Sequence, residues 1–173
     1  MEKILVVIDM QNDFIDGSLG TPEAVAIVDN VVNKINTYKA NNIYATRDTH
    51  FENYLETSEG KNLTVVHCVK ETFGWQINSK VANAIKNSVI IDKPSFGSLE
   101  LAEMLRKRSE KEDIEIELVG LCTDICVVSN AMILKAYMPE VKISVDGSCC
   151  AGVTKESHFK ALDTMKMCQI NVK

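Results

Sequence analysis

Short runs of aliphatic and β-branched residues recur along the 173-residue chain, and segments with helical periodicity separate them. Unbroken apolar runs are typical of parallel strands covered on both faces, and strand–helix alternation is typical of a doubly wound sheet. The predicted strands are Ile4–Ile8, Ile43–Thr46, Val89–Ile91, Ile114–Val119 and Val141–Val145, with a sixth candidate at Gln169–Val172. We therefore predict an α/β fold in one domain over residues 1–173, with a mostly parallel, Rossmann-like sheet of five to six strands and helices on both faces.

Helix start signals occur in several of the segments between these strands. Thr21 followed by Pro22 is a typical N-cap and first helical position, and Ser98 is an N-cap before a second apolar stripe. Thr154 to Lys166 forms a further predicted helix. The stretch from Phe51 to Val66 is polar with little periodicity, so we expect a structureless loop that is functional or mobile.

The charge balance and the apolar pattern exclude several classes of partner. A net charge of −5 gives no basic surface for nucleic acid or for an anionic membrane. No apolar run is long enough to span a bilayer, and residues 1–8 lack the layout of a signal peptide. We therefore expect a cytoplasmic protein with no nucleic-acid or membrane partner.

The six cysteines are expected to stay reduced in that compartment. No CxxC pair is present, which argues against a cysteine-rich zinc site. Four of the six have no predicted chemistry: Cys68, Cys149, Cys150 and Cys168.

Cys126 lies shortly after the predicted strand Ile114–Val119 and its terminal Gly120. Thr123 and Asp124 are good N-cap residues, which places Cys126 in the first turn of a helix at the carboxyl end of a central strand. Free backbone N–H groups and the helix dipole stabilise a thiolate there, and ligands bind at such strand ends. Two interpretations remain open on these residues: a nucleophile, or a small buried apolar residue.

Asp9 and Lys93 also follow predicted strands. Asp9 is placed to take a thiol proton and return it to a leaving amine, and Lys93 would hold positive charge beside both groups. The backbone N–H groups of Cys122 and Cys126 are candidates for an oxyanion hole. The alternatives are a loop cap for Asp9 and a surface position for Lys93.

Three segments together resemble the signature motifs of the isochorismatase-like cysteine hydrolases. They are Ile8–Phe14, Asp92–Phe96 and Gly120–Val127, and the resemblance extends from Ile4 to about Val153. It implies Asp9, Lys93 and Cys126 as a catalytic triad. It also implies a cis peptide bond at Leu121–Cys122.

A second polar group follows the second predicted strand. Asp48 and His50 are two residues apart and project to one side of an extended chain, and His67 comes later. Within the family this pattern resembles the nicotinamidase branch, which binds a divalent metal beside the triad. The resemblance implies Asp48, His50 and His67 as ligands and, because residues 51–66 hold no histidine, a glutamate as the fourth. Glu59 is the predicted ligand and Glu56 the alternative; zinc suits such a set, with iron and manganese as the other candidates.

The same resemblance implies the activity and the assembly. Nicotinamide and water would give nicotinate and ammonia through a cysteine thioester, in NAD salvage, and the protein would be a homo-oligomer. Phe14, Trp75 and Phe96 are candidate walls for a flat ring, with core packing as the alternative. Residues 68–74 depart from the family's glycine-threonine-glycine pattern, and Trp75 follows directly.

Two other functions fit the same residues. One keeps the triad but acts on another small amide or a carbamoyl compound, and it predicts protein without stoichiometric metal. The other is a non-enzymatic metal-binding or redox-sensing protein with Cys126 as the sensor, and it predicts a reactive thiolate without amide turnover.

Overall fold

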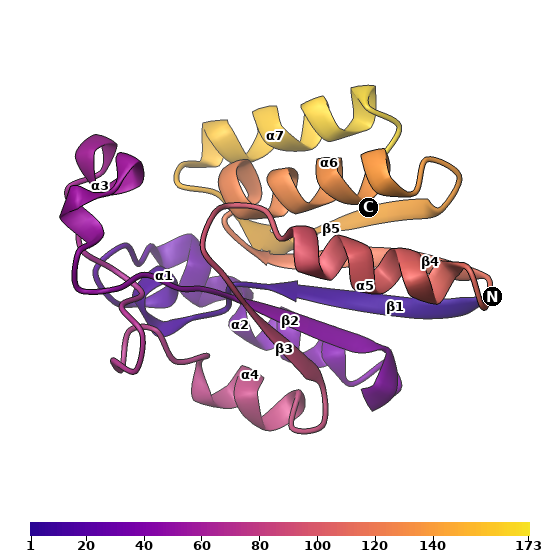
Figure 1. The fold of residues 1–173 in the computed structure, drawn as a ribbon, viewed down its shortest axis with the longest axis horizontal. Helices are drawn as coiled ribbons and strands as arrows, with labels where there is room; N and C mark the ends of the chain where they lie inside the picture. Colours follow the sequence, from indigo (N-terminus) through magenta and orange to yellow (C-terminus); the bar gives the residue numbers. More distant parts are fainter.

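Six parallel strands form one sheet in the computed structural model, which describes residues 1–173 (Figure 1). Their order is β3-β2-β1-β4-β5-β6. Their bounds are β1 Glu2–Ile8, β2 Ile43–Asp48, β3 Val89–Lys93, β4 Ile114–Leu121, β5 Lys142–Ala151 and β6 Asn171–Val172. The predicted α/β fold class is confirmed, and the sheet is parallel throughout.

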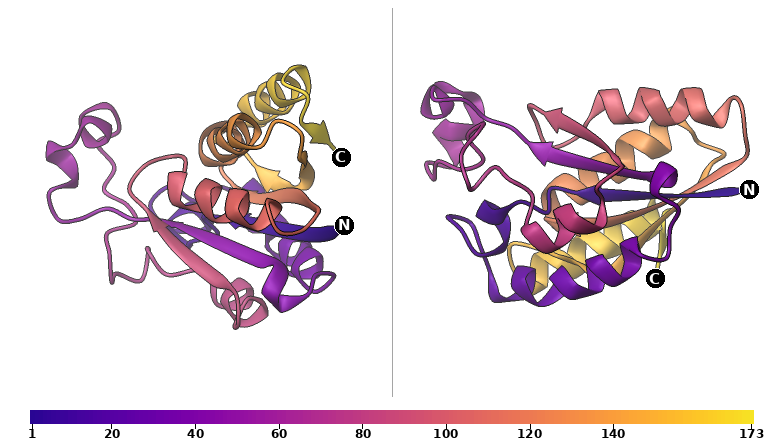
Figure 2. Two further views of the ribbon diagram at one scale, coloured as in Figure 1. Left: turned by 45° about the vertical axis from the view of Figure 1, so that its right-hand side comes forward. Right: turned by 90° about the horizontal axis from the view of Figure 1, so that it is seen from below.

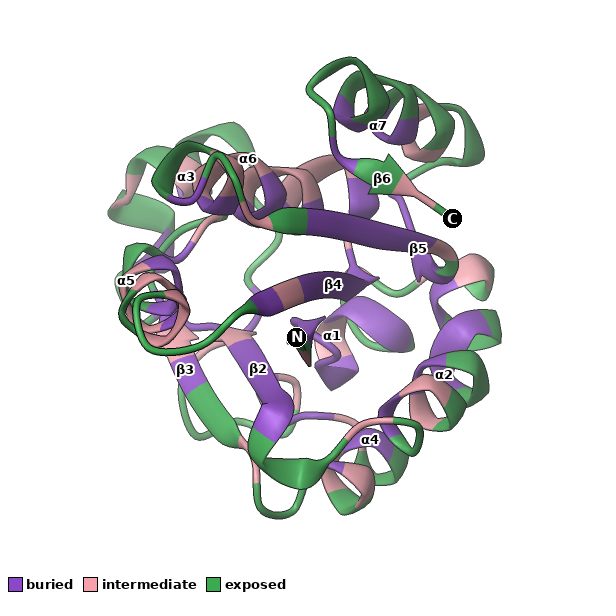
Figure 3. Cartoon of the chain, turned by 90° about the vertical axis from the view of Figure 1, so that its right-hand side faces the viewer, coloured by how far each residue is buried: buried purple, intermediate pink, exposed green.

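Helices cover both faces of this sheet (Figures 1 and 2). One face carries α1 (Asn12–Ile15), α2 (Pro22–Ile35) and α4 (Ser79–Ala84), and the other carries α5 (Leu99–Ser109), α6 (Val128–Tyr137) and α7 (Lys155–Met167). Alternate residues of β1 belong to two separate apolar cores, one on each face. The central strands are therefore covered on both sides, which explains the unbroken apolar runs. Figure 3 shows β4 and β5 as mostly buried.

The predicted helix starts at Thr21 and Ser98 are confirmed. The Thr21 hydroxyl accepts a hydrogen bond from the N–H of Ala24 at 3.0 Å, and the Ser98 hydroxyl accepts one from Leu101 at 3.1 Å. Each bond satisfies an N–H group that the first helical turn leaves free.

The polar stretch between β2 and β3 is more ordered than predicted. It contains a 3₁₀ turn at Tyr54–Glu56 and the short helix α3 (Ser58–Asn62), which Figures 1 and 2 show beyond the strand ends. Tyr54 is buried, and a Cβ on Gly60 would lie 2.1 Å from the Tyr54 carbonyl oxygen. Only glycine allows this approach of α3 to the Tyr54 turn, a contact that no periodicity could reveal.

Strand β5 also runs six residues further than its predicted end at Val145. Asp146-Gly147 resembles a turn in the sequence, but β5 continues because its register against β4 shifts between Leu118 and Gly120. An irregularity of this kind inserts residues without ending the strand. It brings Cys150 opposite Gly120, next to the turn that carries Cys126.

The order of the strands creates a crevice at the carboxyl edge of the sheet. The chain moves outward from β1 through β2 to β3, then returns to β4 on the other side of β1. Such a switch point is where open α/β sheets bind ligands. None of the helices is both long and apolar enough to cross a membrane.

Candidate active site

Four strands deliver polar side chains to this edge. Asp9 follows β1, Asp48 ends β2, Lys93 ends β3 and Cys126 follows β4. All four are buried, with no more than 4% of any of them exposed. The structure therefore brings together the three residues predicted as a triad and one of the predicted metal ligands.

The ammonium group of Lys93 is the centre of this cluster. Its Nζ lies 2.7 Å from Asp9 Oδ2 and 3.3 Å from Asp48 Oδ1, and it donates to the Ser95 carbonyl at 3.0 Å. The Cys126 sulfur lies 3.4 Å away. A buried cation needs such partners, because an unpaired one would be very costly. Burial opposes its charge, but Asp9, Cys126 and Asp48 outweigh it and raise the pKa of Lys93.

Asp9 is oriented by the neighbouring strand. It adopts a positive φ of 46°, and the Thr46 hydroxyl donates to its Oδ1 at 2.6 Å. Its Oδ2 lies beside Lys93 but accepts no hydrogen bond of normal geometry. Burial raises the pKa of Asp9 against the opposing effect of Lys93. This oxygen is therefore available to accept a proton inside the protein.

Cys126 lies in a single π-helical turn, Thr123–Val127, that precedes α6. The prediction that Thr123 and Asp124 cap this helix is wrong. Cys122 is the N-cap residue, and its carbonyl accepts from the N–H groups of Ile125 at 3.1 Å and Val127 at 3.0 Å. The side chains of Thr123 and Asp124 instead form hydrogen bonds with His158 and Val153. They are not needed as caps, because the π-helical turn satisfies its N–H groups through the backbone. The peptide bond Leu121–Cys122 is cis, as the resemblance implied.

The protonation state of Cys126 differs from the expected thiolate. Burial and the Asp9 carboxylate raise the pKa of the Cys126 thiol well above its usual value, and Lys93 offsets this only in part. The helix terminus and the ammonium therefore do not ionise the sulfur on their own. A nucleophile at this position needs a base at the moment of reaction, and Asp9 is the carboxylate beside it.

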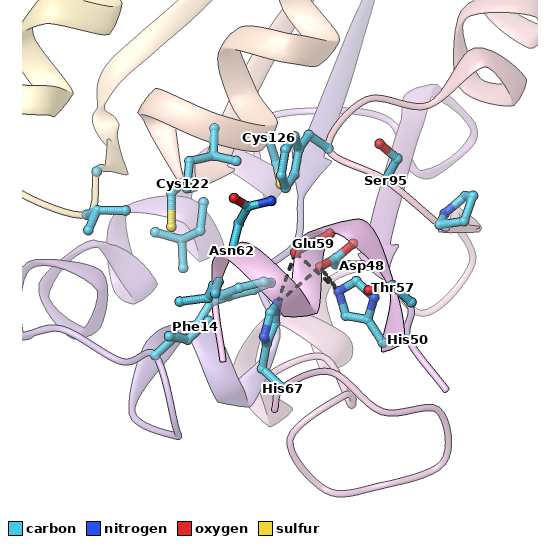
Figure 4. Close-up of a pocket in the computed structure, with 18 of the residues that line it drawn as sticks. Phe14, Asp48, His50, Thr57, Glu59, Asn62, His67, Ser95, Cys122 and Cys126 are labelled. Atoms are coloured by element: carbon cyan, nitrogen blue, oxygen red, sulfur yellow. Dashed lines mark hydrogen bonds and ion pairs between the residues drawn. The ribbon is translucent and has the colours of Figure 1, made fainter. Parts of the chain in front are cut away.

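A second cluster joins the first through Asp48. Its ligand atoms, from Asp48, His50, Glu59 and His67, all lie within 4.8 Å of one another. The Nε2 atom of His50 is 2.9 Å from Asp48 and 3.6 Å from Glu59, and Nε2 of His67 is 3.6 Å from each carboxylate. Figure 4 shows the four side chains pointing toward one another. Glu59 is the glutamate that joins the cluster, whereas the alternative Glu56 is exposed.

The chemistry of this donor set fits a cation. Two carboxylates face two imidazoles, and the Nδ1 atom of His67 is 2.8 Å from the Val65 carbonyl, which leaves Nε2 free to bind a metal. Burial disfavours a charged His50, yet Asp48 and Glu59 outweigh it and raise the pKa of His50 to about 9. The site thus favours positive charge, and two nitrogen and two oxygen ligands suit zinc.

A cavity of about 810 Å³ opens above both clusters. Cys126, Glu59, His50 and His67 line it, together with Cys122. Asp9 and Lys93 do not line it and lie behind Cys126 in the protein interior. A substrate in the cavity would thus meet the sulfur and the metal ligands directly.

The predicted aromatic walls divide into two groups. Phe14 and Phe96 line the cavity, but Trp75 does not. The Trp75 indole donates to the Thr49 hydroxyl at 2.9 Å, and the Arg47 guanidinium lies 3.7 Å from the centre of its ring. Trp75 therefore packs against the end of β2, which favours the alternative of core packing over substrate contact.

Three polar residues that sequence reasoning missed hold the site together. Besides Thr46, Gln11 bonds to the backbone of Asp48 through both its amide oxygen at 2.7 Å and its amide nitrogen at 2.8 Å. Asn130 donates to the carbonyls of Cys126 at 2.8 Å and Phe96 at 3.0 Å. The sequence signal that could have revealed such residues is a polar side chain at a position that the strand or helix pattern assigns to the interior, where it needs a hydrogen-bond partner.

Comparison with known proteins agrees with this arrangement. The model of the isochorismatase domain matches residues 3–172. The chain belongs to the isochorismatase family. This confirms the family resemblance carried by the three motifs.

Relatives within the isochorismatase family match over nearly the whole chain. The uncharacterized isochorismatase family protein PncA of Bacillus subtilis (strain 168) is 28% identical, covering 94% of this chain and 93% of that protein. The pyrazinamidase of Pyrococcus horikoshii, solved in complex with zinc, is 26% identical with a TM-score of 0.81, covering 100% of this chain and 99% of that one. The nicotinamidase PncA of B. subtilis is 26% identical with a TM-score of 0.79, covering 99% of each chain.

Proposed function

We propose that this protein is a nicotinamidase that hydrolyses nicotinamide to nicotinate and ammonia. The observation that carries the proposal is the position of Lys93. Its ammonium contacts Asp9, Asp48 and the Cys126 sulfur. One buried cation therefore connects the proposed base and nucleophile with the metal-ligand cluster, and Cys126 and that cluster line the same cavity. Similarity to solved nicotinamidases and pyrazinamidases supports the same activity. The product is a precursor for pyridine nucleotides, which would place the reaction in NAD salvage in the cytoplasm.

The raised pKa values of Asp9 and Cys126 support the proposed acylation step. Asp9 takes the thiol proton as the Cys126 sulfur attacks the carboxamide carbon. The backbone N–H groups of Cys122 and Cys126 would stabilise the oxyanion. Asp9 then returns the proton to the amide nitrogen, the carbon–nitrogen bond breaks, ammonia leaves and a thioester remains.

Deacylation reuses the same residues. Asp9 accepts a proton from a water molecule that attacks the thioester carbonyl, and the proton then passes to the Cys126 sulfur as the carbon–sulfur bond breaks. The acid leaves and ionises to nicotinate, giving its proton to the released ammonia in solution, and the resting thiol is restored. Lys93 stays protonated throughout, since Asp9, Cys126 and Asp48 raise its pKa, and it limits the cost of negative charge in the buried site.

The metal-ligand cluster would hold one divalent cation, with zinc as the first candidate and iron or manganese as the others. When bound, such a cation supplies a Lewis acid to which a pyridine nitrogen can coordinate. Asp48, His50, Glu59 and His67 would hold that cation in the same cavity that Cys126 lines. Phe14 and Phe96, which line the cavity, would contact the ring.

Ammonia release from nicotinamide, with and without a chelator, tests the proposal. We expect turnover that chelation removes and that added zinc restores. Full turnover by protein that holds no metal would instead favour hydrolysis of another small amide by the same triad. No release from nicotinamide or from a panel of small amides, together with rapid alkylation of Cys126, would contradict an enzymatic role and favour a redox sensor.

A further inference from the structure

The turn that carries Cys126 is held from outside by α7. The Thr123 hydroxyl, in a side chain with no exposed surface, lies 2.7 Å from Nδ1 of His158. Next to it, the Asp124 carboxylate accepts the N–H of Val153 at 3.1 Å. Two consecutive residues of the turn are therefore bonded to the segment that begins α7.

His158 has no other evident task. It does not line the cavity and is not part of the metal-ligand cluster. Burial lowers its pKa, so the imidazole is neutral at neutral pH and has one nitrogen able to accept a hydrogen bond. The start of α7 also packs closely against the wall of the cavity. Gly152 lines the cavity, and a Cβ atom on it would lie 2.9 Å from the backbone nitrogen of His158.

Of the two candidate oxyanion donors, Cys126 lies in the turn that His158 holds and Cys122 directly precedes it. Thr123 directly follows Cys122 and precedes Cys126 by three residues. Cys122 lines the cavity, and its N–H group donates to no acceptor within the protein. A donor aimed at a developing oxyanion is effective only when the protein fixes it before the reaction.

We propose that His158 is a positioning residue that acts through Thr123 to hold the oxyanion-stabilising turn in its productive place. The inference rests on the proposed amidase function and adds a residue that touches neither substrate nor sulfur. Under this proposal, the nucleophilicity of the sulfur and the stabilisation of the oxyanion depend on different residues. The nucleophilicity of Cys126 depends on Asp9 and Lys93, whereas stabilisation of the oxyanion depends on the turn.

The test compares His158→Phe, which removes the ring nitrogens, with His158→Asn, whose amide oxygen can replace Nδ1. For His158→Phe we expect kcat for nicotinamide to fall by about 10- to 100-fold, with KM within about twofold of the wild type. Alkylation of Cys126 by iodoacetamide, which forms no oxyanion, should keep its rate. His158→Asn should recover most of the turnover.

Two further variants complete the test. Thr123→Val should match the loss seen in His158→Phe, and the double variant should lose no more than either single one, because both remove the same bond. Met167→Ala, at an exposed position at the other end of α7, should keep wild-type turnover.

The outcomes separate the two proposals. If wild-type protein turns nicotinamide over and His158→Phe does so equally well, the positioning role is wrong. The same holds if alkylation slows in proportion to kcat, or if the melting temperature falls and His158→Asn gives no recovery, since the residue then supports the fold alone. If wild-type protein releases no ammonia, the proposed function is contradicted, and this inference with it.

Discussion

At the scale of the residue, the site depends on charges that are buried together. Asp9, Lys93 and Asp48 leave almost no surface exposed, and each has a charged partner within 3.3 Å. Buried charges persist only when they are paired in this way. The same burial sets the proton positions, because it favours the neutral thiol of Cys126 and raises the pKa of Asp9.

Replacing the proposed base tests this account. Asp9→Asn should lower kcat for nicotinamide by about 10²- to 10⁴-fold, because no carboxylate then accepts the thiol proton. The exposed Asp16→Asn serves as the matched control and should keep wild-type turnover. A kcat for folded Asp9→Asn within a few-fold of the wild type would contradict the role of Asp9.

The pH dependence of kcat/KM carries a related prediction. Burial raises the pKa of Asp9, and a protonated Asp9 accepts no proton from the thiol. Activity should therefore fall as the pH drops through a value above the range of an ordinary aspartate, which is about 3.9. An acid limb at or below that ordinary value would show that another group takes the proton.

At the scale of the element, short segments rather than long helices place the metal ligands. Glu59 reaches the cluster because α3 packs closely against the Tyr54 turn at Gly60, and His67 lies in irregular chain after α3. Tyr54 is buried against both imidazoles, with ring centres 4.7 Å from His50 and 5.0 Å from His67. The segment between β2 and β3 is therefore part of the site.

Two glutamates of this segment form a matched pair for mutation. Glu59→Gln should weaken zinc binding by more than about tenfold and reduce turnover at limiting zinc, because the cluster loses a charged ligand. Glu56→Gln should change neither property, since that side chain is exposed. Zinc titration by calorimetry measures the affinity, and equal affinities in the two variants would exclude Glu59 as a ligand.

The elements also show what sequence reasoning could reach. The shared location of Asp9, Lys93 and Cys126 is predictable because each lies shortly after an unbroken apolar run, and parallel strands end at one edge. Their proposed roles come from the family resemblance. The cap at Cys122 was missed because a π-helical turn satisfies its N–H groups through the backbone, so no capping side chain marks it. Thr46 was missed because a threonine in a strand looks like an ordinary strand former.

At the scale of the whole molecule, a second buried charge cluster ties β4 to the chain end. Glu117 on β4 accepts from the Tyr38 hydroxyl and from Lys173, each at 2.6 Å, and Lys34 lies 3.4 Å away. Burial opposes the ionisation of Glu117, but Lys173, Tyr38 and Lys34 outweigh it and lower its pKa. Glu117 does not line the catalytic cavity.

Glu117→Gln should therefore affect stability and leave turnover unchanged. We expect the free energy of unfolding at pH 7 to fall by about 1–3 kcal/mol, because three partners lose their charged acceptor. Since the pKa is lowered in the folded state, this stabilisation is present above the ordinary glutamate value of about 4.3 and is lost as the pH falls through the lowered one. Urea unfolding of both proteins at several pH values measures it, and a difference that grows on acidification would contradict the assignment.

The most direct test of the central claim is the rate of ammonia release from nicotinamide by zinc-loaded wild-type protein and by Cys126→Ala. The alanine variant should fold and bind zinc as the wild type does, because only one buried sulfur is removed. We expect steady turnover by the wild type and none above background by the variant. Equal release by the two proteins would show that the Cys126 sulfur is not the nucleophile.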